Sequence, residues 1–537
     1  MNARRFRFLL AAVVLLAASS SARPQAPAPG PTATPTPQPQ NPAENPEDIR
    51  ARQPRPTPLD TETKFPPPQQ SAEEEARSSN RPNEADLLPG ERAVLLDGRP
   101  FPERQPYDPK FPAARRTRFV SVEASGPGDG SLEHPWKDLQ QALCALEPGD
   151  RLVVASGIYT GSFRVAGACN SGTADAPIQV FARHAFLKSG GGDVLTVERA
   201  YWQFWELQIA LLDSSAVGLV VRGPDAHDVA IDQTHIYEGN GPAVVLAAGS
   251  SRITVSNSHI HQSMGVRIEP GASSVTLVNN HIHHNRAASV TIGSGPGGSP
   301  PRGVSLLGNR IHNDHGPALV LSRCDGVTAS RNRFSNYRPD EDDGSGGEAI
   351  VIGTCRDAAV ENNSILEATV AVRVGSASGA EPPASVGFSR NYLQNTLTEK
   401  STAFAVDSGL SIRLNNNVID RYAEPFRIGA GVKGLTIANN LVLGPKTAFW
   451  LASWDSISLF DYNVFGVDGD WNAVVASAPV SASWVTKHMP HTHAVGGVTL
   501  SGGDLARIQG FTAVDAGTAV DKTPYQGKAP DIGVSEH

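Results

Sequence analysis

The stretch VTLVNNHI at residues 275–282 decides the fold, because close variants of it recur along the chain. The clearest copies are VSLLGNRI (304–311), AAVENNSI (358–365), IRLNNNVI (412–419) and LTIANNLV (435–442). Each combines a short apolar strand, one or two Asn residues and a further apolar residue. That last residue recurs at intervals between 22 residues (Ile260 to Ile282) and 31 residues (Phe334 to Ile365). Intervals of this length are typical of the coils of a solenoid.

The pattern inside each copy predicts β-strands. Apolar and polar residues alternate, as expected for a strand with one buried face. A second apolar run precedes each copy, as in GVRIE (265–269), ASVTI (288–292) and PALVL (317–321). We therefore expect an all-β protein, a right-handed parallel β-helix of ten or more coils with three short strands per coil.

One Asn column marks a corner of this solenoid. Its members are Asn280, Asn309, Asn332, Asn363, Asn391, Asn417 and Asn440, with Thr234 and Ser258 at the same place in earlier coils. Asn tolerates left-handed backbone angles at a sharp turn. Its amide can also donate to, and accept from, an amide one coil away, so the column predicts a hydrogen-bonded ladder.

The chain divides into four regions. Residues 1–22 combine arginines, an apolar run and small residues, which predicts a cleaved secretory signal peptide. Residues 23–115 are rich in Pro and lack apolar periodicity, so we expect a disordered linker. The parallel β-helix should span 116–465, with an N-terminal capping helix at 134–147, and 466–537 should form a C-terminal cap.

The four cysteines predict two disulfides. Cys144 and Cys169 are close in sequence, whereas Cys324 and Cys355 follow equivalent strands and should stack in adjacent coils. Two disulfides favour an oxidising compartment, so we expect a secreted or periplasmic protein. The alternative is that the thiols are reduced and buried.

Two segments near the ends resemble a known superfold. FVSVEASGPGDGSLEHPWKDLQQAL (119–143) followed by PGDRLVVASGIYTG (148–161) resembles the opening of secreted bacterial parallel β-helix proteins of the pectate-lyase-like superfold. FTAVDAGTAV (511–520) and APDIGVSEH (529–537) are similar to their closing phrases. The resemblance implies the fold and does not specify the activity, because the superfold hosts lyases, hydrolases, epimerases and binding proteins.

The resemblance also implies a substrate groove along one sheet, on the face of the GVRIE-type strands. Arginine forks on this face would suit the carboxylates of an anionic polysaccharide, and an aromatic ring could stack on a sugar. The alternative is a solvated face with compensating acids. The predicted substrate-binding residues are Arg222, Glu269, Arg323, Arg373, Arg427 and Trp450.

Histidines form the second candidate cluster. His235, His259 and His281 should occupy one outward column, and His261, His283 and His312 the next. Imidazoles can act as general bases at neutral pH, and histidines of adjacent coils could bind a transition metal. The alternative is an exterior ladder without chemistry. The predicted catalytic residues are His284, His312, His315 and Arg267, with Asp314 nearby.

Two further motifs bear on the activity. Asp-Ala-His-Asp (225–228) and HGPALVLSR (315–323) resemble fragments of alginate-type C5-epimerases, although Ala226 stands where those enzymes have Pro. Asp340, Asp342 and Asp343, within an acidic run flanked by glycines, could bind Ca²⁺. The alternative is a solvated loop tip.

Together these patterns favour a β-helix protein that binds an anionic, uronate-type polysaccharide. If the protein is an enzyme, we expect β-elimination by a lyase or, as the alternative, C5-epimerisation. The alternative is a non-catalytic carbohydrate-binding or cell-surface solenoid. A net charge of −8 does not favour nucleic acid, and no second apolar segment suggests membrane insertion. We expect a monomer.

Overall fold

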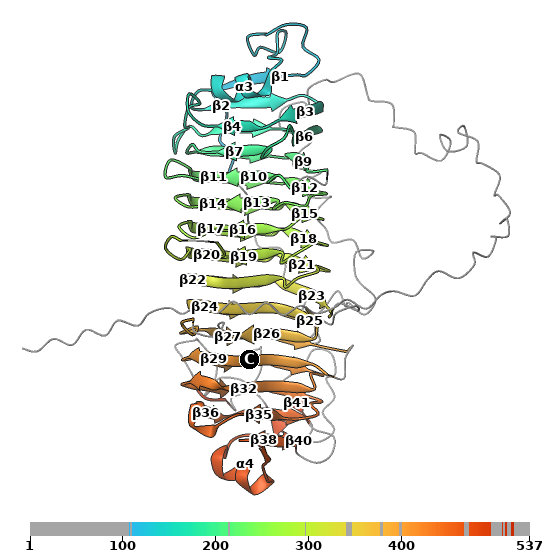
Figure 1. Ribbon diagram of the computed structural model, residues 1–537, viewed down its shortest axis with the longest axis vertical. Helices are drawn as coiled ribbons and strands as arrows, with labels where there is room; N and C mark the ends of the chain where they lie inside the picture. The colour runs from blue at the N-terminus through green and yellow to red at the C-terminus, as the bar shows by residue number, and fades with distance from the viewer. Residues whose placement is uncertain are drawn as a thin grey trace, which may run out of the picture. The chain divides into compact units, whose positions relative to one another are not determined.

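The computed structural model describes residues 107, 110–212, 215–295, 297–339, 346–375, 380–396, 400–466, 472–495, 507–508, 511–512 and 517–519. All of them belong to one unit, Glu62–His537. The chain winds into a parallel β-solenoid in which each coil contributes a strand to three ladders (Figure 1). The predicted all-β fold with three short strands per coil is confirmed.

The three ladders follow one another in chain order within each coil. The first ladder comprises β1 (Arg116–Val120), β2 (Asp150–Val154), β5 (Ile178–Phe181), β8 (Trp202–Trp205), β11 (His227–Asp232), β14 (Ser251–Ser256), β17 (Ser273–Val278), β20 (Arg302–Leu307), the later parts of β22 (Leu319–Ser330) and β24 (Glu348–Glu361), β27 (Gly387–Ser389), β30 (Arg413–Asn415), β33 (Leu435–Ala438) and β36 (Ile457–Asp461). The second ladder comprises β3 (Gly157–Gly161), β6 (Ala185–Ser189), β9 (Gln208–Ala210), β12 (His235–Tyr237), β15 (His259–His261), β18 (His281–His283), β21 (Arg310–His312), β23 (Arg333–Tyr337), β25 (Ser364–Ala368), β28 (Tyr392–Gln394), β31 (Val418–Asp420), β34 (Leu441–Leu443), β37 (Val464–Gly466) and β40 (His493–Val495). The third ladder comprises β4 (Phe163–Val165), β7 (Leu195–Val197), β10 (Leu219–Val221), β13 (Val244–Leu246), β16 (Val266–Ile268), β19 (Val290–Ile292), the early parts of β22 and β24, β26 (Val370–Val374), β29 (Thr402–Leu410), β32 (Glu424–Lys433), β35 (Phe449–Leu451) and β38 (Ala473–Val475). The second ladder has 14 strands, which confirms the expectation of ten or more coils.

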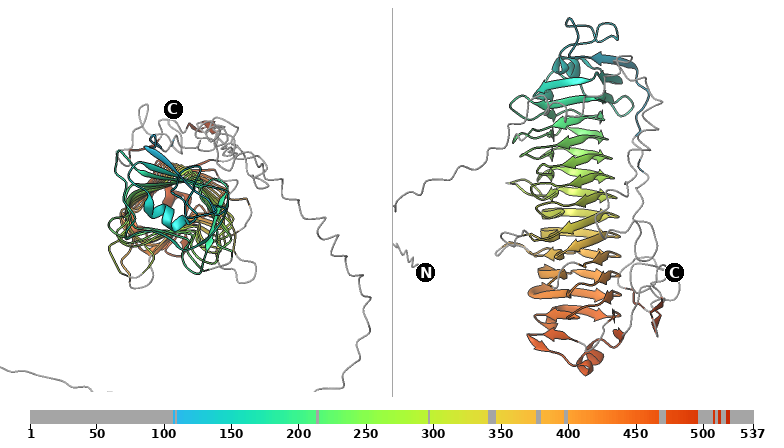
Figure 2. Two further views of the ribbon diagram at one scale, coloured as in Figure 1. Left: turned by 90° about the horizontal axis from the view of Figure 1, so that it is seen from above. Right: turned by 90° about the vertical axis from the view of Figure 1, so that its right-hand side faces the viewer.

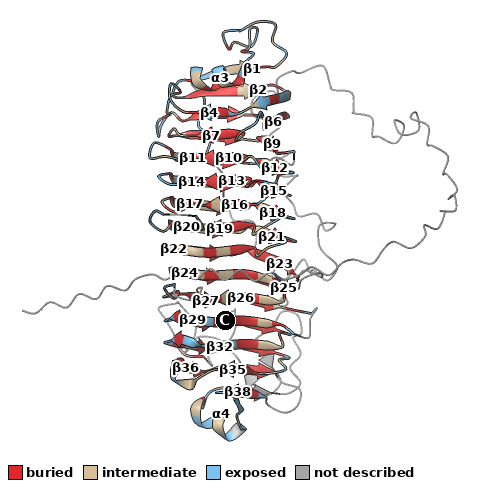
Figure 3. Ribbon diagram, in the orientation of Figure 1, coloured by how far each residue is buried: buried red, intermediate tan, exposed pale blue. Residues whose placement is uncertain are grey.

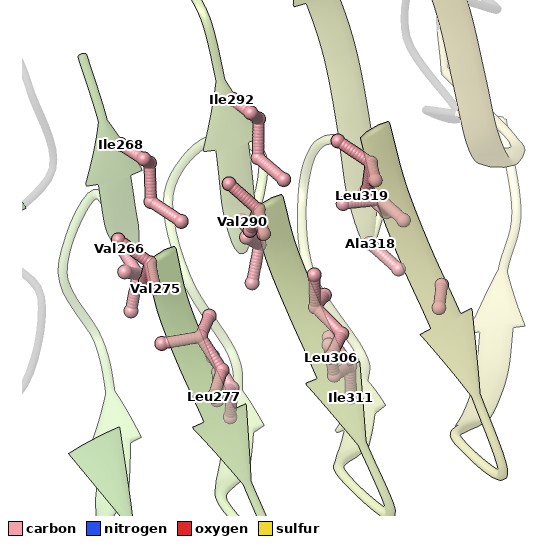
Figure 4. Packing of buried hydrophobic residues seen from close by; sticks show 14 of the residues in the cluster. Val266, Ile268, Val275, Leu277, Val290, Ile292, Leu306, Ile311, Ala318 and Leu319 are labelled. Atoms are coloured by element: carbon pink, nitrogen blue, oxygen red, sulfur yellow. The ribbon is translucent and has the colours of Figure 1, made fainter. Parts of the chain in front are cut away.

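The core is a stack of aliphatic side chains inside the coils. Alternate residues of each strand point inward, so buried and less buried positions alternate along the ribbon (Figure 3). Ile268 and Ile292 are register partners in the third ladder, and Leu277 and Leu306 are partners in the first. Figure 4 shows these side chains stacked from coil to coil. Burying each such side chain contributes about 1.5–3 kcal/mol, so the repeating Ile, Leu and Val columns drive the winding.

The predicted Asn ladder forms at the corner between the first and second ladders. Each Asn Nδ2 donates to the Oδ1 of the Asn in the next coil, from Asn280 to Asn309 (3.0 Å) through to Asn440 and Asn463 (2.9 Å). The same Oδ1 atoms accept backbone N–H groups, as Asn332 Oδ1 does from Asn309 N at 2.9 Å. The ladder therefore provides hydrogen-bond partners for buried amide groups at the corner, where strands do not pair.

The left-handed residue at this corner is the one before the ladder Asn. Asn279, Asn362, Asn416 and Asn439 all have φ between 55° and 58°, whereas the ladder residues that follow them do not have positive φ. The sequence interpretation attributed both roles to one Asn. Two roles at consecutive positions explain the recurring Asn-Asn pair, because Asn tolerates the left-handed region.

The first coil carries a short helix. α3 (Leu139–Ala145) lies within the predicted 134–147 but is shorter, because the Asp138 side chain caps it by accepting from Gln141 N and Leu146 is already extended. Trp136 precedes the helix and forms a bridge to Val120. Leu139, Ala142 and Leu143 are buried, and α3 lies over the coil when viewed along the solenoid (Figure 2). Its capping role stays a prediction.

The solenoid continues past the predicted boundary at 465. β38 pairs with β35, and β40 pairs with β37, so one further partial coil extends the third and second ladders. Helix α4 (Ala482–His488) stands between them in the chain, and Val485 and Met489 join the buried core. The rest of the predicted cap, apart from a few short segments, lies outside the described residues.

Residues 110–115 belong to the folded part and not to the predicted linker. The Phe111 ring stacks on Trp205 at a centroid distance of 4.9 Å, and Gln179 Nε2 donates to Pro112 O at 2.8 Å. An aromatic ring packed on the first ladder explains why this piece is ordered. The predicted signal peptide and nearly all of the remaining linker lie outside the described residues.

Both predicted disulfides are present. Cys144 is bonded to Cys169, and Cys324 to Cys355, which are direct register partners of β22 and β24. All four cysteines of the chain are therefore oxidised, as is typical of proteins from oxidising compartments. Among the residues that the structure describes, neither helix is long and apolar enough to span a lipid bilayer.

Candidate functional site

The third ladder exposes the predicted arginines, but they do not form one column. Arg267, Arg373 and Arg427 share one register column, in which Thr291, Val320 and Val351 separate Arg267 from Arg373. Trp450 continues this column, with the Arg427 guanidinium 5.7 Å from its ring centroid. Arg222 lies one position past β10, in the neighbouring column that contains Ala247 and Glu269.

Carboxylates compensate the arginines of this face. Arg267 forms an ion pair with Glu269 at 3.0 Å, and Arg427 with Glu424 at 3.6 Å. Arg373 lies between Glu348 (3.3 Å) and Asp407 (3.1 Å). Arg323 instead donates from Nη2 to the backbone oxygens of Gly297 (2.7 Å) and Gly298 (3.1 Å).

A cleft lies where the third ladder turns toward the first. Its volume is about 420 Å³, and its lining comes from consecutive coils. Ala247 and Ala248 contribute small side chains, and the charged groups come from neighbouring turns. The lining residues are Glu198, Arg199, Arg222, Gly223, Pro224, Asp225, Ala247, Ala248 and Glu269. Two predicted site residues, Arg222 and Glu269, therefore contribute to one cleft.

Two guanidinium groups share one carboxylate in this cleft. Glu198 Oε1 accepts from Arg222 Nε at 2.8 Å and from Arg164 Nη2 at 3.0 Å. The hydrogen bond from Arg222 is the main reason that the pKa of Glu198 is lowered, so the carboxylate stays ionised. Two cations around one anion leave this cluster with a net charge of +1.

The Asp-Ala-His-Asp fragment borders the same cleft. Asp225 lines the cleft and lies 3.8 Å from Arg199, while Ala226 is buried. His227 Nδ1 lies 2.7 Å from Asp228, which also binds Arg252 at 2.7 Å and has a lowered pKa because of that hydrogen bond. The fragment thus supplies one cleft carboxylate and one internally paired His–Asp unit.

Six outward histidines of the second ladder form two stacked columns, which we call the histidine ladder. His235, His259 and His281 stack with ring centroids 4.8 and 5.0 Å apart. His261, His283 and His312 stack beside them, with both centroid distances at 5.1 Å. The predicted columns are confirmed by the register of β12, β15, β18 and β21.

The two columns are linked diagonally through their Nε2 atoms. His235 contacts His261 at 2.9 Å, His259 contacts His283 at 2.6 Å, and His281 contacts His312 at 2.8 Å. Each such pair requires one ring to donate its Nε2 proton and the other to accept it, so the accepting ring must be neutral.

Burial keeps these rings neutral. Burial first, and neighbouring histidines second, lower the pKa of His235 to about 4 and that of His259 to about 3. The pKa of His283 falls to about 3 mainly by burial. For His281 and His312 burial lowers the pKa to about 2, with the His312 ring and Arg310, respectively, adding to the shift.

Of the four predicted catalytic residues, the structure brings together His284 and His312, whose ring centroids are 6.1 Å apart. His312 belongs to the histidine ladder, and His284 is a left-handed corner residue (φ 51°) whose Nδ1 lies 2.6 Å from that of His283. His315 is an exposed turn residue, and Arg267 lies on the third ladder beside Glu269. These residues therefore lie on different ladders and turns, and their catalytic role stays a prediction.

Asp314 serves a corner inside the solenoid. Its Oδ1 accepts from Asn285 N (2.8 Å) and its Oδ2 from the Tyr337 hydroxyl (3.1 Å). Burial raises the pKa of Asp314 to about 7. Ser263 continues the chain of contacts through Asn285 Oδ1 (2.8 Å), so this set forms a second polar corner. The predicted calcium ligands Asp340, Asp342 and Asp343 lie outside the described residues.

The sequence interpretation missed Glu198, Arg164 and Arg199. Glu198 follows LTV (195–197) as Arg222 follows LVV (219–221). The coil spacing could therefore have located Glu198, one coil before Arg222. Arg199 and Asp225 lie in turns, where the alternation of a strand gives no direction for a side chain.

No family model and no curated protein matches the chain. Solved structures do match. An alginate lyase from Paenibacillus sp. str. FPU-7 is 20% identical, with a TM-score of 0.37 over 56% of this chain and 94% of that one. Pectate lyase Pel9A is 16% identical, with a TM-score of 0.36 over 79% and 96%. The Streptococcus pneumoniae surface protein and adhesin PfbA is 12% identical, with a TM-score of 0.43 over 66% and 99%.

These similarities assign no activity, because the three proteins differ in function and the identities are 20% or lower. The three parallel ladders show by themselves that the chain is a parallel β-solenoid, which is the fold that the sequence resemblance implied.

Proposed function

We propose that the protein binds an anionic, uronate-type polysaccharide in the cleft beside the third ladder. The observation that carries the proposal is the sharing of Glu198 by Arg164 and Arg222. The side chains of Arg164, Arg222 and Glu198 together carry one net positive charge, while Arg199, Asp225 and Glu269 add one guanidinium and two carboxylates to the cleft. A ligand carboxylate would complete the compensation.

The donors of Arg222 suit such a ligand. A guanidinium has five N–H donors, and its hydrogen bond to Glu198 uses Nε. The side chain is 44% exposed, so its terminal nitrogens can meet a carboxylate from solvent in the bidentate geometry that arginine favours. Asp225 and Glu269 on the same cleft offer acceptors for sugar hydroxyls.

The direction of the cleft suits a polymer. Glu198, Arg222 and Glu269 follow β7, β10 and β16, so the charged groups are spaced along the solenoid axis. Adjacent parallel strands lie ~4.8 Å apart. An extended chain running along the axis would meet several coils in turn, and a polysaccharide has that form.

A second candidate function is proton abstraction at C5 of the bound uronate, the first step of both β-elimination and C5-epimerisation. The specific observation in its favour is that Asp225, from the fragment similar to alginate-type C5-epimerases, lines the cleft. Arg222 would neutralise the uronate carboxylate and so make this proton more acidic, and the Asp225 carboxylate would accept the proton. A secreted or periplasmic location, which the disulfides support, completes the proposal.

Calorimetric titration with polygalacturonate and alginate tests the binding site. Arg222→Ala should weaken binding about 10–100-fold, because a hydrogen bond between charged groups contributes about 1.5–3 kcal/mol. Arg302→Ala is the matched control, since Arg302 also pairs with a carboxylate, Asp325 at 3.1 Å, but lies on the first ladder. The control should bind like the wild type.

The same samples separate binding from catalysis. Unsaturated product in the absorbance spectrum, or an epimerised signal by NMR, would support the second candidate function. Binding without product would identify a carbohydrate-binding solenoid. A neutral glucan that binds as tightly as both uronate polymers, or an Arg222→Ala variant with unchanged affinity, would refute the proposal.

A further inference from the structure

We propose that the histidine ladder binds one divalent transition-metal ion, of the zinc class, through His235, His259 and His261. The ring nitrogens of these three residues lie within 4.8 Å of one another. They come from the adjacent strands β12 and β15, so the second ladder fixes their spacing. This site is separate from the cleft, which lies beside the third ladder.

The spacing of the nitrogens fits one ion. Zinc binds imidazole nitrogens at ~2.0–2.1 Å, so two ligands of one ion lie at most ~4.2 Å apart. The Nε2 atoms of His235 and His261 are 2.9 Å apart, within this limit. The His259 ring is parallel to that of His235 and 4.8 Å from it, so the two rings must turn toward each other for both to bind the same ion.

Metal binding requires proton shifts within the rings, one in the His235–His261 pair and one more where His259 Nε2 carries the proton of its contact with His283. In the metal-free His235–His261 pair, one Nε2 carries the shared proton. When that ring changes tautomer, the proton moves to Nδ1 and both Nε2 lone pairs become available.

The surrounding charges select this triple over its neighbour. His259, His281 and His283 form a second group with the same nitrogen spacing. Arg310 is the register partner of His281 in the next coil, so a cation at the second group lies near a positive charge. Glu238 directly follows Tyr237, the register partner of His261, so a cation at the first triple lies near a negative charge.

The chemistry of the ligands narrows the metal. Imidazole suits Zn²⁺, Ni²⁺ and Cu²⁺, whereas Ca²⁺ and Mg²⁺ prefer oxygen ligands. Three histidines leave a coordination position for water. The site is therefore expected to take up Zn²⁺ and to ignore Ca²⁺.

Calorimetry with ZnCl₂ tests this proposal on the full chain, purified without a polyhistidine tag and dialysed against EDTA. One Zn²⁺ per chain should bind, and His259→Gln and His235→Gln should each weaken binding at least 100-fold. His281→Gln, outside the triple, should change the affinity less than threefold. Gln is a matched replacement, because Gln208 occupies the His235 position in the preceding coil.

An exposed histidine provides the background control. His134→Gln should bind zinc like the wild type. Anomalous scattering at the zinc edge should place the ion between β12 and β15. The absence of saturable zinc binding, equal loss in all variants, or loss with His281→Gln but not His235→Gln would overturn the proposal. Circular dichroism confirms that each variant is folded before it is titrated.

Discussion

Replacing Asn332 by Ala is expected to lower the free energy of unfolding by about 4 kcal/mol. The side chain is fully buried, and its Nδ2 donates to Asn363 Oδ1 and to Leu306 O, both at 3.0 Å. Its Oδ1 accepts from the N and Nδ2 atoms of Asn309, both at 2.9 Å. Alanine removes all four hydrogen bonds and leaves their buried donors and acceptors without partners. An unpaired buried polar group costs more free energy than its hydrogen bond contributes.

Urea-induced unfolding measures the loss, and hydrogen exchange of the Asn309 amide reports it locally. Asn332→Ser should recover about half, because Ser258 occupies the same ladder position and its hydroxyl accepts the Thr234 amide at 3.1 Å. Asn472→Ala is the control, since Asn472 is exposed and its hydrogen bonds are 3.4 Å long. Equal losses for Asn332→Ala and Asn472→Ala would contradict the structural role of the ladder.

Acidification of the metal-free protein from pH 7.5 to 5 is expected to cost up to ~7 kcal/mol of stability. The five histidines His235, His259, His281, His283 and His312 have pKa values of about 2 to 4 in the folded state. Unfolded, they would titrate near 6.5. The unfolded chain therefore binds protons first, so their contribution is complete above pH ~6.5 and is lost as pH falls.

The size of this effect has an upper bound. At pH 5 each ring that stays neutral in the folded state costs up to ~2 kcal/mol, so five rings cost up to ~10 kcal/mol. Asp314 acts in the opposite direction. Its folded pKa of about 7 is above the unfolded value, so it adds stability as pH falls below 7.

The double variant His281→Gln, His312→Gln isolates the histidine contribution. It retains Asp314, so its loss of stability between pH 7.5 and 5 should be up to ~4 kcal/mol smaller than that of the wild type. His134→Gln should leave the pH dependence unchanged. Urea unfolding at both pH values, with EDTA present, gives the comparison. An unchanged pH dependence in the double variant would show that these rings are protonated without cost in the folded state.

The fold could be predicted from the sequence because the repeat records the geometry of the coil. Ile260, Ile282 and Ile311 recur because each fills the same inward position of the second ladder. The ladder Asn residues recur because the amide of each one hydrogen-bonds to the Asn amide of the neighbouring coil. The prediction stopped at Asn440, although Asp-Tyr-Asn-Val (461–464) extends the same pattern to Asn463.

The site was less predictable, because its geometry depends on contacts between coils. The register could place Arg373 outward, but not between Glu348 and Asp407. It could align the histidines in columns, but the diagonal Nε2 contact between His235 and His261 depends on ring rotation. Turns such as the one that contains Asp225 vary in length and have no period, so no repeat locates their side chains.

The most direct test of the proposed function is a crystal structure of the protein with a uronate oligosaccharide at saturating concentration. The proposal predicts a sugar chain along the cleft, with one carboxylate within hydrogen-bond distance of the Arg222 guanidinium. An oligosaccharide bound elsewhere, for example against Trp450, or a cleft without sugar at saturation would contradict it.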